Sequence, residues 1–460
     1  MNKSEAHSER RRFVLGVLPW VVAAGSLIVY LATLNHWVSF NSLLAVAKVS
    51  GWTWQPDLTG PLYWALTLPL RRLPAQAIPV ALNLFSTVCA VLTLALLARS
   101  VALLPQDRTQ EQREREKSEF SLLSIRGAWL PPVLAAVVLG LQLTFWENAT
   151  SASGQLEDLT ATPFVNHCEM LELLLFAYVI RCLLEFRISD RQSWLSRAAF
   201  AYGLGMTSNW AMTGLLPVFA IAVVRFKGLS FFNARFLVRM TLWGLAGLSF
   251  FFLLPAVQSL ADISRVPFWP AFMTSLGYQK ATLASIHSYF TYSKDQALLL
   301  AVTSLIPIFL IGLRWSPHFG DSSRLGTWLT TLTFQVVQAV FLGACIWVAL
   351  DPKLSPRNSG FSTPCFTLFY LGALSVGYFS GYFLLVHGRP SRGLRKRSSP
   401  TLVNQCVLCA VWLLLPTVPA LLVWRNLPQI RLTNGPMLKQ YAAQQAEAHC
   451  ALRGRLTADR

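Results

Sequence analysis

The chain has 460 residues, of which 54% are hydrophobic and only 13% are charged. Soluble domains carry about 25% charged residues, so this composition excludes an ordinary soluble domain and predicts an all-α integral membrane protein. The net charge of +18 would suggest nucleic acid in a soluble protein. Here the basic residues lie in short loops between apolar runs, as in membrane proteins, so the expected partner is the lipid bilayer and no nucleic acid.

Apolar runs that could cross a bilayer recur along the chain. A helix needs about 20 apolar residues to span a hydrocarbon core of about 30 Å. Runs near this length occupy residues 13–34, 77–104, 129–146, 169–187, 237–258, 296–313, 326–350, 365–387 and 403–424. The first run is longer than the apolar part of a typical secretory signal, so we expect it to be a retained span.

The basic segments orient these runs. Residues 1–12 and the loops at 105–128 and 389–397 are expected on the cytoplasmic side. An even number of crossings must then lie between the two loops. The interrupted stretch 198–226 satisfies this count if it is re-entrant or a broken hairpin around Thr207 to Asn209, and a plain kinked helix is the alternative. The total is about 10–11 transmembrane segments.

The same count defines the outer face. Residues 13–425 form a multi-span transmembrane domain, and residues 426–460 form a short outer tail. The outer loops are at residues 35–76, 147–168, 259–295 and 351–364. The first and third are rich in aromatic residues, which favour the headgroup layer, so we expect them to form short amphipathic helices on the membrane surface.

Ionisable residues are sparse inside the predicted spans. A proton- or ion-coupled transporter normally carries acidic or His residues near the middle of a span. The sequence predicts none there, which weakens that function. Arg181 and Glu185 are spaced i, i+4 and are expected to form a structural ion pair.

At the outer face, the charged residues have the chemistry that a transferase of a lipid-phosphate sugar needs. A carboxylate such as Asp57 or Glu147 would deprotonate the acceptor hydroxyl, and a cation such as Arg265 or Lys280 would stabilise the phosphate leaving group. Loop residues are also charged simply because they are in water. The eight cysteines are scattered and fit neither disulfides nor a zinc site, so no metal or cofactor is predicted.

Four short segments keep the order of a known family over about the first half of the chain. They are Gly60-Pro61-Leu62-Tyr63, Ala81-Leu82-Asn83-Leu84-Phe85-Ser86, Thr144-Phe145-Trp146-Glu147 and Gly203-Leu204-Gly205-Met206. In them the chain resembles the bacterial domain of unknown function 2723 family, which is related to the protein O-mannosyltransferases and shares their C-type glycosyltransferase architecture. The resemblance implies a bacterial inner-membrane protein with an outward-facing site and a polyprenyl-phosphate-linked sugar as donor. The charge pattern places its N-terminus in the cytoplasm and its C-terminus outside.

The polar positions depart from the family pattern. Asn41 stands where family members carry an acidic residue, and an amide cannot act as a general base. Gln55 stands where relatives often have a His, and Ser208 and Asn209 follow the Gly-Leu-Gly turn where relatives also often have a His. We therefore expect these amides to line the pocket, so that the base must be another residue.

Two functions follow from this pattern. The first is a mannosyltransferase-like membrane glycosyltransferase, with Asp57 or Glu147 as base, Asn41, Gln55 and Asn209 lining the pocket, and Arg265 or Lys280 near phosphate. The second is a non-enzymatic membrane scaffold, or a lipid or solute carrier, with the same fold. An outward cavity lined by a carboxylate and a cation would favour transfer, and an apolar or through-going cavity would favour the second function.

Overall fold

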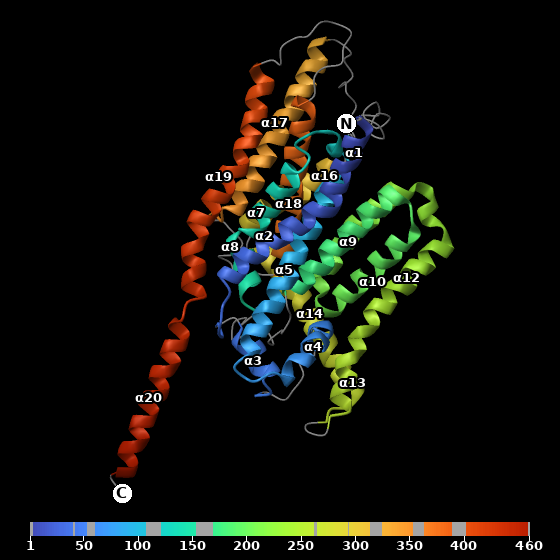
Figure 1. Cartoon of the computed structure of the whole chain (residues 1–460). Coiled ribbons are helices and arrows are strands. Elements are labelled where there is room, and N and C mark those ends of the chain that lie inside the picture. Colours follow the sequence, from blue (N-terminus) through green and yellow to red (C-terminus); the bar gives the residue numbers. More distant parts are fainter. Residues whose placement is uncertain are drawn as a thin grey trace.

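The structure is a computed structural model. It describes residues 3–39, 42–52, 60–106, 121–152, 169–261, 265–292, 294–312, 324–352, 363–388 and 402–458. Every regular element in these ranges is a helix, which confirms the all-α prediction. Figure 1 shows an elongated bundle whose long helices run roughly along one axis, with α20 (Met437–Ala458) projecting from it.

Within the described ranges, seven helices are long and apolar enough to cross a membrane. They are Ser8–Ala32, Ile78–Leu103, Met212–Phe232, Ala234–Ser259, Leu332–Ala349, Phe366–His387 and Asn404–Ala448. A bent pair, α7 (Leu130–Gly140) and α8 (Leu143–Thr150), meets at 74° and makes an eighth if it is one span. The prediction of 10–11 segments also counts α9 (Glu169–Ser189), which has the length of a span but several charged residues. It counts residues 296–313 as well, where the apolar helix Ala301–Ile311 is shorter than a span.

The N-terminal helix, the residues before α7 and the end of α18 (Thr363–His387) meet at one end of the bundle. Arg10 Nη1 donates to the carbonyl of Ser124 at 3.0 Å. Leu18, Leu122 and Leu385 are buried in one cluster. We call this the N-terminal end. The charge pattern predicted that these segments share one end, although the basic residues at 108–117 and 389–397 lie outside the described ranges.

The opposite end, which we call the distal end, is where the first loop meets the ends of α8 and α19 (Leu402–Thr433). Asn35 N donates to the carbonyl of Thr150 at 3.0 Å, and Asn434 Nδ2 donates to the carbonyl of Thr33 at 2.7 Å. Two short helices, α3 (Leu43–Val49) and α4 (Pro61–Thr67), lie at this end (Figure 1). Their placement on a membrane surface stays a prediction.

The interrupted stretch 198–226 is a hairpin. It consists of α10 (Gln192–Ser208), a 3-10 segment η4 (Trp210–Leu215) and α11 (Leu216–Lys227). Tyr202 Oη donates to the carbonyl of Met212 at 2.7 Å, and its ring centroid lies 5.7 Å from that of Phe219. Seventeen residues of straight helix would separate the two rings by about 25 Å. The predicted hairpin with a break at residues 207–209 is confirmed, and the kinked helix is excluded.

The third loop, at residues 259–295, differs from the short surface helices expected there. After α12 (Ala234–Leu248), η6 (Ser249–Phe252) and α13 (Leu253–Ser259), most of it forms one helix, α14 (Phe268–Tyr292). Ala271, Ser275 and Gln279 are buried on this helix at i, i+4 spacing. Because this stripe is narrow and partly polar, an average of hydropathy along the sequence does not detect it.

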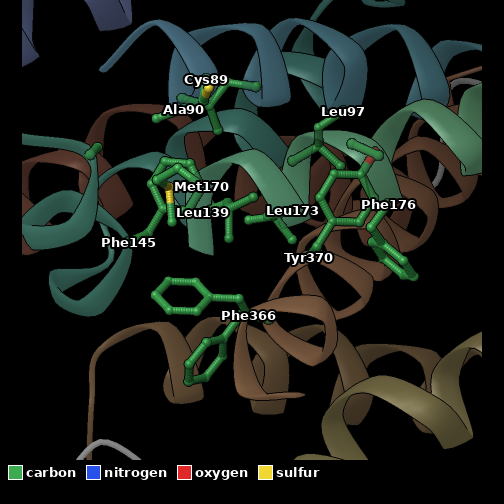
Figure 2. Close-up of a cluster of buried hydrophobic side chains, with 14 of the residues drawn as sticks. Cys89, Ala90, Leu97, Leu139, Phe145, Met170, Leu173, Phe176, Phe366 and Tyr370 are labelled. Atoms are coloured by element: carbon green, nitrogen blue, oxygen red, sulfur yellow. The ribbon is translucent and has the colours of Figure 1, made fainter. Parts of the chain in front are cut away.

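The chain then returns along the bundle. The elements are α15 (Lys294–Leu300), a π-helical turn η7 (Ala301–Leu305), α16 (Ile306–Gly312) and α17 (Arg324–Ala349), followed by α18 and α19. The main core lies where α5 (Ile78–Leu103), α7, α8, α9 and α18 meet (Figure 2). In it the ring of Phe176 contacts the ring of Tyr370 edge to face, with centroids 5.6 Å apart.

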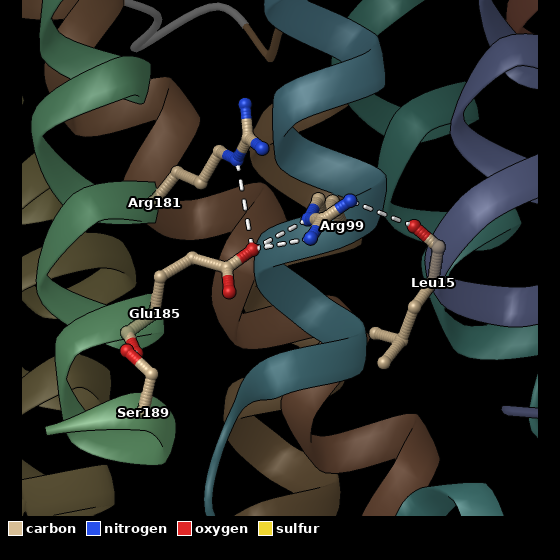
Figure 3. A network of polar contacts seen from close by, with 5 residues as sticks. All are labelled: Leu15, Arg99, Arg181, Glu185 and Ser189. Carbon is tan, nitrogen blue, oxygen red and sulfur yellow. Dashed lines mark hydrogen bonds and ion pairs between the residues drawn. The ribbon is translucent and has the colours of Figure 1, made fainter. Parts of the chain in front are cut away.

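Glu185 of α9 joins three helices nearer the N-terminal end (Figure 3). It accepts from Arg99 Nε of α5 at 2.7 Å, and Arg99 Nη1 also donates to the carbonyl of Leu15 at 3.0 Å. The predicted pair with Arg181 is present, but its N···O distance is 3.8 Å. The stronger partner of Glu185 is therefore Arg99, which sequence spacing could not indicate.

We expect Glu185→Gln to destabilise the protein more than Arg181→Ala. The first change keeps an acceptor but removes the carboxylate charge that pairs with Arg99 on another helix, and leaving that half-buried guanidinium without a counter-charge costs about 1–3 kcal/mol. The second removes a long pair on one helix, which contributes less than about 1 kcal/mol. Unfolding midpoints in detergent would measure the difference. A larger loss in Arg181→Ala would contradict the arrangement in Figure 3.

Candidate functional site

Two carboxylates are buried in the first turn of α9, at the distal end. Glu169 and Glu172 are one turn apart and lie on the same side of the helix. Glu172 is 4% exposed, and its Oε2 accepts from Nδ2 of Asn209 at 3.3 Å. Asn209 is 2% exposed and is the residue at which the hairpin breaks. We call Glu169, Glu172 and Asn209 the acidic cluster.

Gln279 of α14 satisfies the backbone on both sides of the same break. Its Nε2 donates to the carbonyl of Ser208 at 3.1 Å, and its Oε1 accepts from the backbone N–H of Trp210 at 3.0 Å. Gln279 is 1% exposed. Backbone groups freed by a break inside a membrane protein need partners from the protein or from water. The side chain of Gln279 is the partner of two of these backbone groups. It thereby fixes α14 beside the acidic cluster.

Glu172 has unused bonding capacity. Glu172 Oε1 accepts no hydrogen bond from the part of the chain that the structure describes. Burying a carboxylate costs several kcal/mol unless it is paired or bonded. Such a group can accept a proton or a hydrogen bond from a bound molecule. Within the described ranges, no group of three or more His, Cys, Asp or Glu side chains could hold a metal ion.

Of the residues predicted as base or pocket lining, the structure describes Glu147 and Asn209. These two have different hydrogen-bond partners. Glu147 of α8 is half-buried and accepts from Thr433 Oγ1 of α19 at 3.5 Å. Asn209 bonds instead to Glu172. The structure therefore associates Asn209 with a carboxylate that was not selected from the sequence.

The two predicted cations are exposed. Arg265 Nε donates to the carbonyl of Ser259 at 3.0 Å, across the turn between α13 and α14. Lys280 follows the buried Gln279 on α14 but is itself exposed. Both lie on the distal part of the fold, and neither is buried with the acidic cluster. Three further predicted residues, Asn41, Gln55 and Asp57, lie outside the described residues.

The sequence carried a signal for Glu169 and Glu172, and none for Gln279. Two carboxylates one turn apart at the start of an apolar run are costly to bury, which marks them as candidates. They stand at the start of the predicted span 169–187 and were not selected as site residues. Gln279 bonds only to backbone that the break exposes, and no residue pattern records that pairing.

No protein-family profile matches this chain, and no curated protein is significantly similar to it. The family resemblance therefore stays a prediction from four short segments. Two of those segments have evident structural roles. Asn83 bonds the distal loops to α5, and Gly203 allows α10 to approach α12 closely. Packing alone accounts for these residues, so their presence in a segment carries little evidence for an activity.

Proposed function

We propose that this membrane protein binds a polyprenyl-phosphate-linked sugar at the distal end of the bundle and transfers the sugar to an acceptor. The observation that carries the proposal is Glu172, a carboxylate buried at the loop-bearing end of an apolar bundle with one oxygen that no described group engages. Ionisable residues buried in membrane proteins are costly and usually functional. If the basic segments are cytoplasmic, the distal end faces outside, where the sequence predicts the site.

In the proposed reaction, a carboxylate of the acidic cluster takes the proton of the acceptor hydroxyl. The hydroxyl oxygen bonds to the anomeric carbon of the sugar, and the bond from that carbon to the phosphate oxygen breaks. The phosphate leaves with the electron pair and remains attached to its lipid. Arg265 and Lys280 are the proposed cations for this phosphate. Asp57 and Glu147 remain the alternative bases from the sequence.

We expect Glu172→Gln to lower sugar transfer by about 10²–10⁴-fold, because a positioned general base contributes that much. The isosteric change keeps the bond to Asn209 possible while removing the base. The assay is the transfer of radiolabel from polyprenyl-phosphate mannose to membrane acceptors in vesicles containing the purified protein. Glu447→Gln, which changes an exposed carboxylate of α20, is the matched control and should transfer at the wild-type rate.

Circular dichroism and the unfolding midpoint would show that each variant is folded. Wild-type transfer by folded Glu172→Gln would remove the acidic cluster from the mechanism. If Asp57→Ala then abolished transfer, the base would lie in the first loop. If none of the variants and not even the wild type transferred label, the sugar-transfer proposal would fail.

A carrier of lipid or another apolar solute is the second candidate function. A recess between α7, η7, α17 and α18 has a described lining without charged side chains, but it has room for about one water, so a carrier would need this recess to widen. An apolar cavity is what a carrier needs, and a transferase site needs charge. Binding of lipid without any transfer of label would favour the carrier.

A further inference from the structure

A strongly basic surface lies where α9 ends, α10 begins, α11 ends and α12 begins. Between residues 181 and 239 the chain has eight basic residues and two acidic ones. Figure 1 shows α9, α10 and α12 side by side. The basic residues are Arg181, Arg187, Arg191, Arg197, Arg225, Lys227, Arg235 and Arg239. We call these eight residues the basic patch.

The basic patch lies at the other end of α9 from the acidic cluster. The helix has 21 residues and therefore spans about 30 Å, which is about the thickness of a hydrocarbon core. Glu172 is in its first turn. Glu185, near its last turn, is joined through Arg99 to the carbonyl of Leu15 near the N-terminal end. An inference about the patch thus concerns the opposite leaflet and goes beyond the proposed function.

On the side of α9 and α10, one aromatic ring positions two cations. The guanidinium carbons of Arg181 and Arg197 lie 5.8 Å and 4.8 Å from the ring centroid of Trp194, in the first turn of α10. Attraction to a ring orients a guanidinium without neutralising its charge. Arg197 is exposed. This side therefore presents oriented positive charge to its surroundings.

On the side of α11 and α12, a second group of cations adjoins the first. The ammonium nitrogen of Lys227 lies 3.6 Å from the ring centroid of Phe236. Arg239 Nη1 donates to Oε1 of Gln192 at 3.2 Å, which joins the start of α12 to the start of α10. The basic patch is therefore one surface that consists of two neighbouring groups of cations.

The basic patch has little negative charge of its own. Arg191, Arg225 and Arg235 are exposed, and none of them forms an ion pair with the part of the chain that the structure describes. The two acidic residues are Glu185, which already binds a cation of α5, and the exposed Asp190. Cations held close together repel one another, so an anion that binds among them is stabilised.

Exposed apolar side chains lie in the same part of the chain as these cations. Leu229 and Phe232 belong to η5 (Gly228–Phe232), which connects α11 to α12, and Leu237 and Val238 lie on α12. Residues 212–232 and 234–259 are helices apolar enough to cross a membrane. A soluble anion gains nothing from such apolar surface, whereas the acyl chains of a lipid bury it. The combination favours an anionic lipid over a soluble anion.

We propose that the basic patch binds an anionic lipid with two phosphates, of the cardiolipin class, in the leaflet at the N-terminal end. One phosphate faces the cations of α9 and α10, and the other faces those of α11 and α12. The acyl chains lie along Leu229, Leu237 and Val238. A lipid with one phosphate engages only one of the two groups. Basic sites between membrane helices on the cytoplasmic side, where the sequence predicts this end, are typical of such headgroups.

The test is native mass spectrometry of the full-length protein in detergent, titrated separately with cardiolipin and with phosphatidylglycerol. We expect the wild type to bind cardiolipin at least about tenfold more tightly, because two more cations are engaged. The triple variant Arg191→Gln, Arg225→Gln, Arg235→Gln should lose at least about tenfold in affinity for cardiolipin. Trp194→Leu keeps every charge but releases two guanidiniums, and should lose about twofold to fivefold.

A second triple variant, Arg72→Gln, Arg431→Gln, Lys439→Gln, is the matched control. It removes the same charge from exposed positions elsewhere and should bind cardiolipin as the wild type does. Circular dichroism and unfolding midpoints show which variants are folded. The comparison of the two lipids on the wild type needs no substitution, so it tests the proposal in any case.

Equal affinity of the wild type for the two lipids would overturn the choice of a lipid with two phosphates. Wild-type affinity in the folded first triple variant would overturn the site, and wild-type affinity in Trp194→Leu would overturn the role of the ring. Displacement of cardiolipin by equimolar tripolyphosphate would overturn the choice of a lipid. None of these readouts depends on sugar transfer, so failure here is distinguishable from failure of the proposed function.

Discussion

Gly247→Ala is expected to destabilise the protein strongly, whereas Gly244→Ala, one turn away on α12, is expected to have little effect. A Cβ at residue 247 would lie 2.2 Å from the carbonyl oxygen of Phe200 and 2.8 Å from the backbone nitrogen of Leu204 on α10. These are backbone atoms, so the whole helix must move away. At residue 244 the nearest atom is the carbonyl oxygen of Ala199 at 3.8 Å, an ordinary contact.

The expected loss for Gly247→Ala is about 1–3 kcal/mol or more, which is typical of overpacking. Gly244→Ala should be neutral or slightly stabilising, because Ala favours helix more than Gly does. Gly203→Ala tests the other side of the interface, since its Cβ would lie 2.1 Å from the carbonyl oxygen of Gly244. Unfolding midpoints in detergent would compare the three. Equal unfolding midpoints for Gly244→Ala and Gly247→Ala would show that α10 and α12 are not packed this closely.

The consequence for the site follows from the hairpin. α10 carries Asn209 at its end, so a displaced α10 moves Asn209 away from Glu172. We therefore expect Gly247→Ala to lower any activity that depends on the acidic cluster, while Gly244→Ala retains it. Comparing Gly247→Ala with Gly244→Ala therefore tests whether activity depends on the packing of α10, without changing a residue of the acidic cluster.

Asn83→Leu is the second substitution with a large expected effect. Asn83 is fully buried on α5, and its Nδ2 donates to the carbonyls of Asn35 at 2.6 Å and Trp37 at 3.2 Å. Its Oδ1 accepts from the backbone N–H of Ala152 at 2.8 Å. One amide thus bonds the first loop and the residues after α8 to the same helix. Leu has a similar size but can satisfy none of these backbone groups.

Each buried backbone group left without a partner costs about 1–3 kcal/mol, so we expect a total loss of about 3 kcal/mol or more. The backbone at residues 35–39 and 42–52 should also exchange its amide hydrogens faster. Hydrogen exchange and the unfolding midpoint measure the two effects. Leu84→Ala changes the exposed neighbour on the same helix and should alter neither by much. Unchanged exchange in Asn83→Leu would show that the loop is held by other contacts.

Several features of the fold were predictable because they depend on local composition. The hairpin at residues 198–226 is one, since Asn209 and the residues around it interrupt an apolar run and the crossing count required a reversal. The position of Arg10 and Ser124 at the same end of the bundle is another predictable feature, since basic residues stay on one side of a membrane. Other features were not predictable. The length of α14 was missed because its buried stripe is narrow and partly polar, and the partner of Glu185 was missed because Arg99 is far away in sequence.

The candidate site also contains both predictable and unpredictable features. The sequence placed a break at Asn209, which the structure shows, but it did not select Glu172, the carboxylate to which Asn209 bonds. Glu147 accepts a hydrogen bond from Thr433 of α19, a contact that the sequence did not indicate, and its role as a base stays a prediction. Residue type and spacing indicate which groups are polar. They do not indicate which of them meet.

The sequence by itself determined that this protein is helical, that it resides in a membrane, and that its chain is interrupted near residue 209, because apolar runs, basic loops and helix breaks are local properties. Only the tertiary structure decided that Gln279 completes the break, that Glu172 is buried beside it, and that Gln142 lines an apolar recess. Those pairings depend on which helices touch. Lipid-facing and protein-facing apolar surfaces have the same composition, so the sequence does not distinguish them.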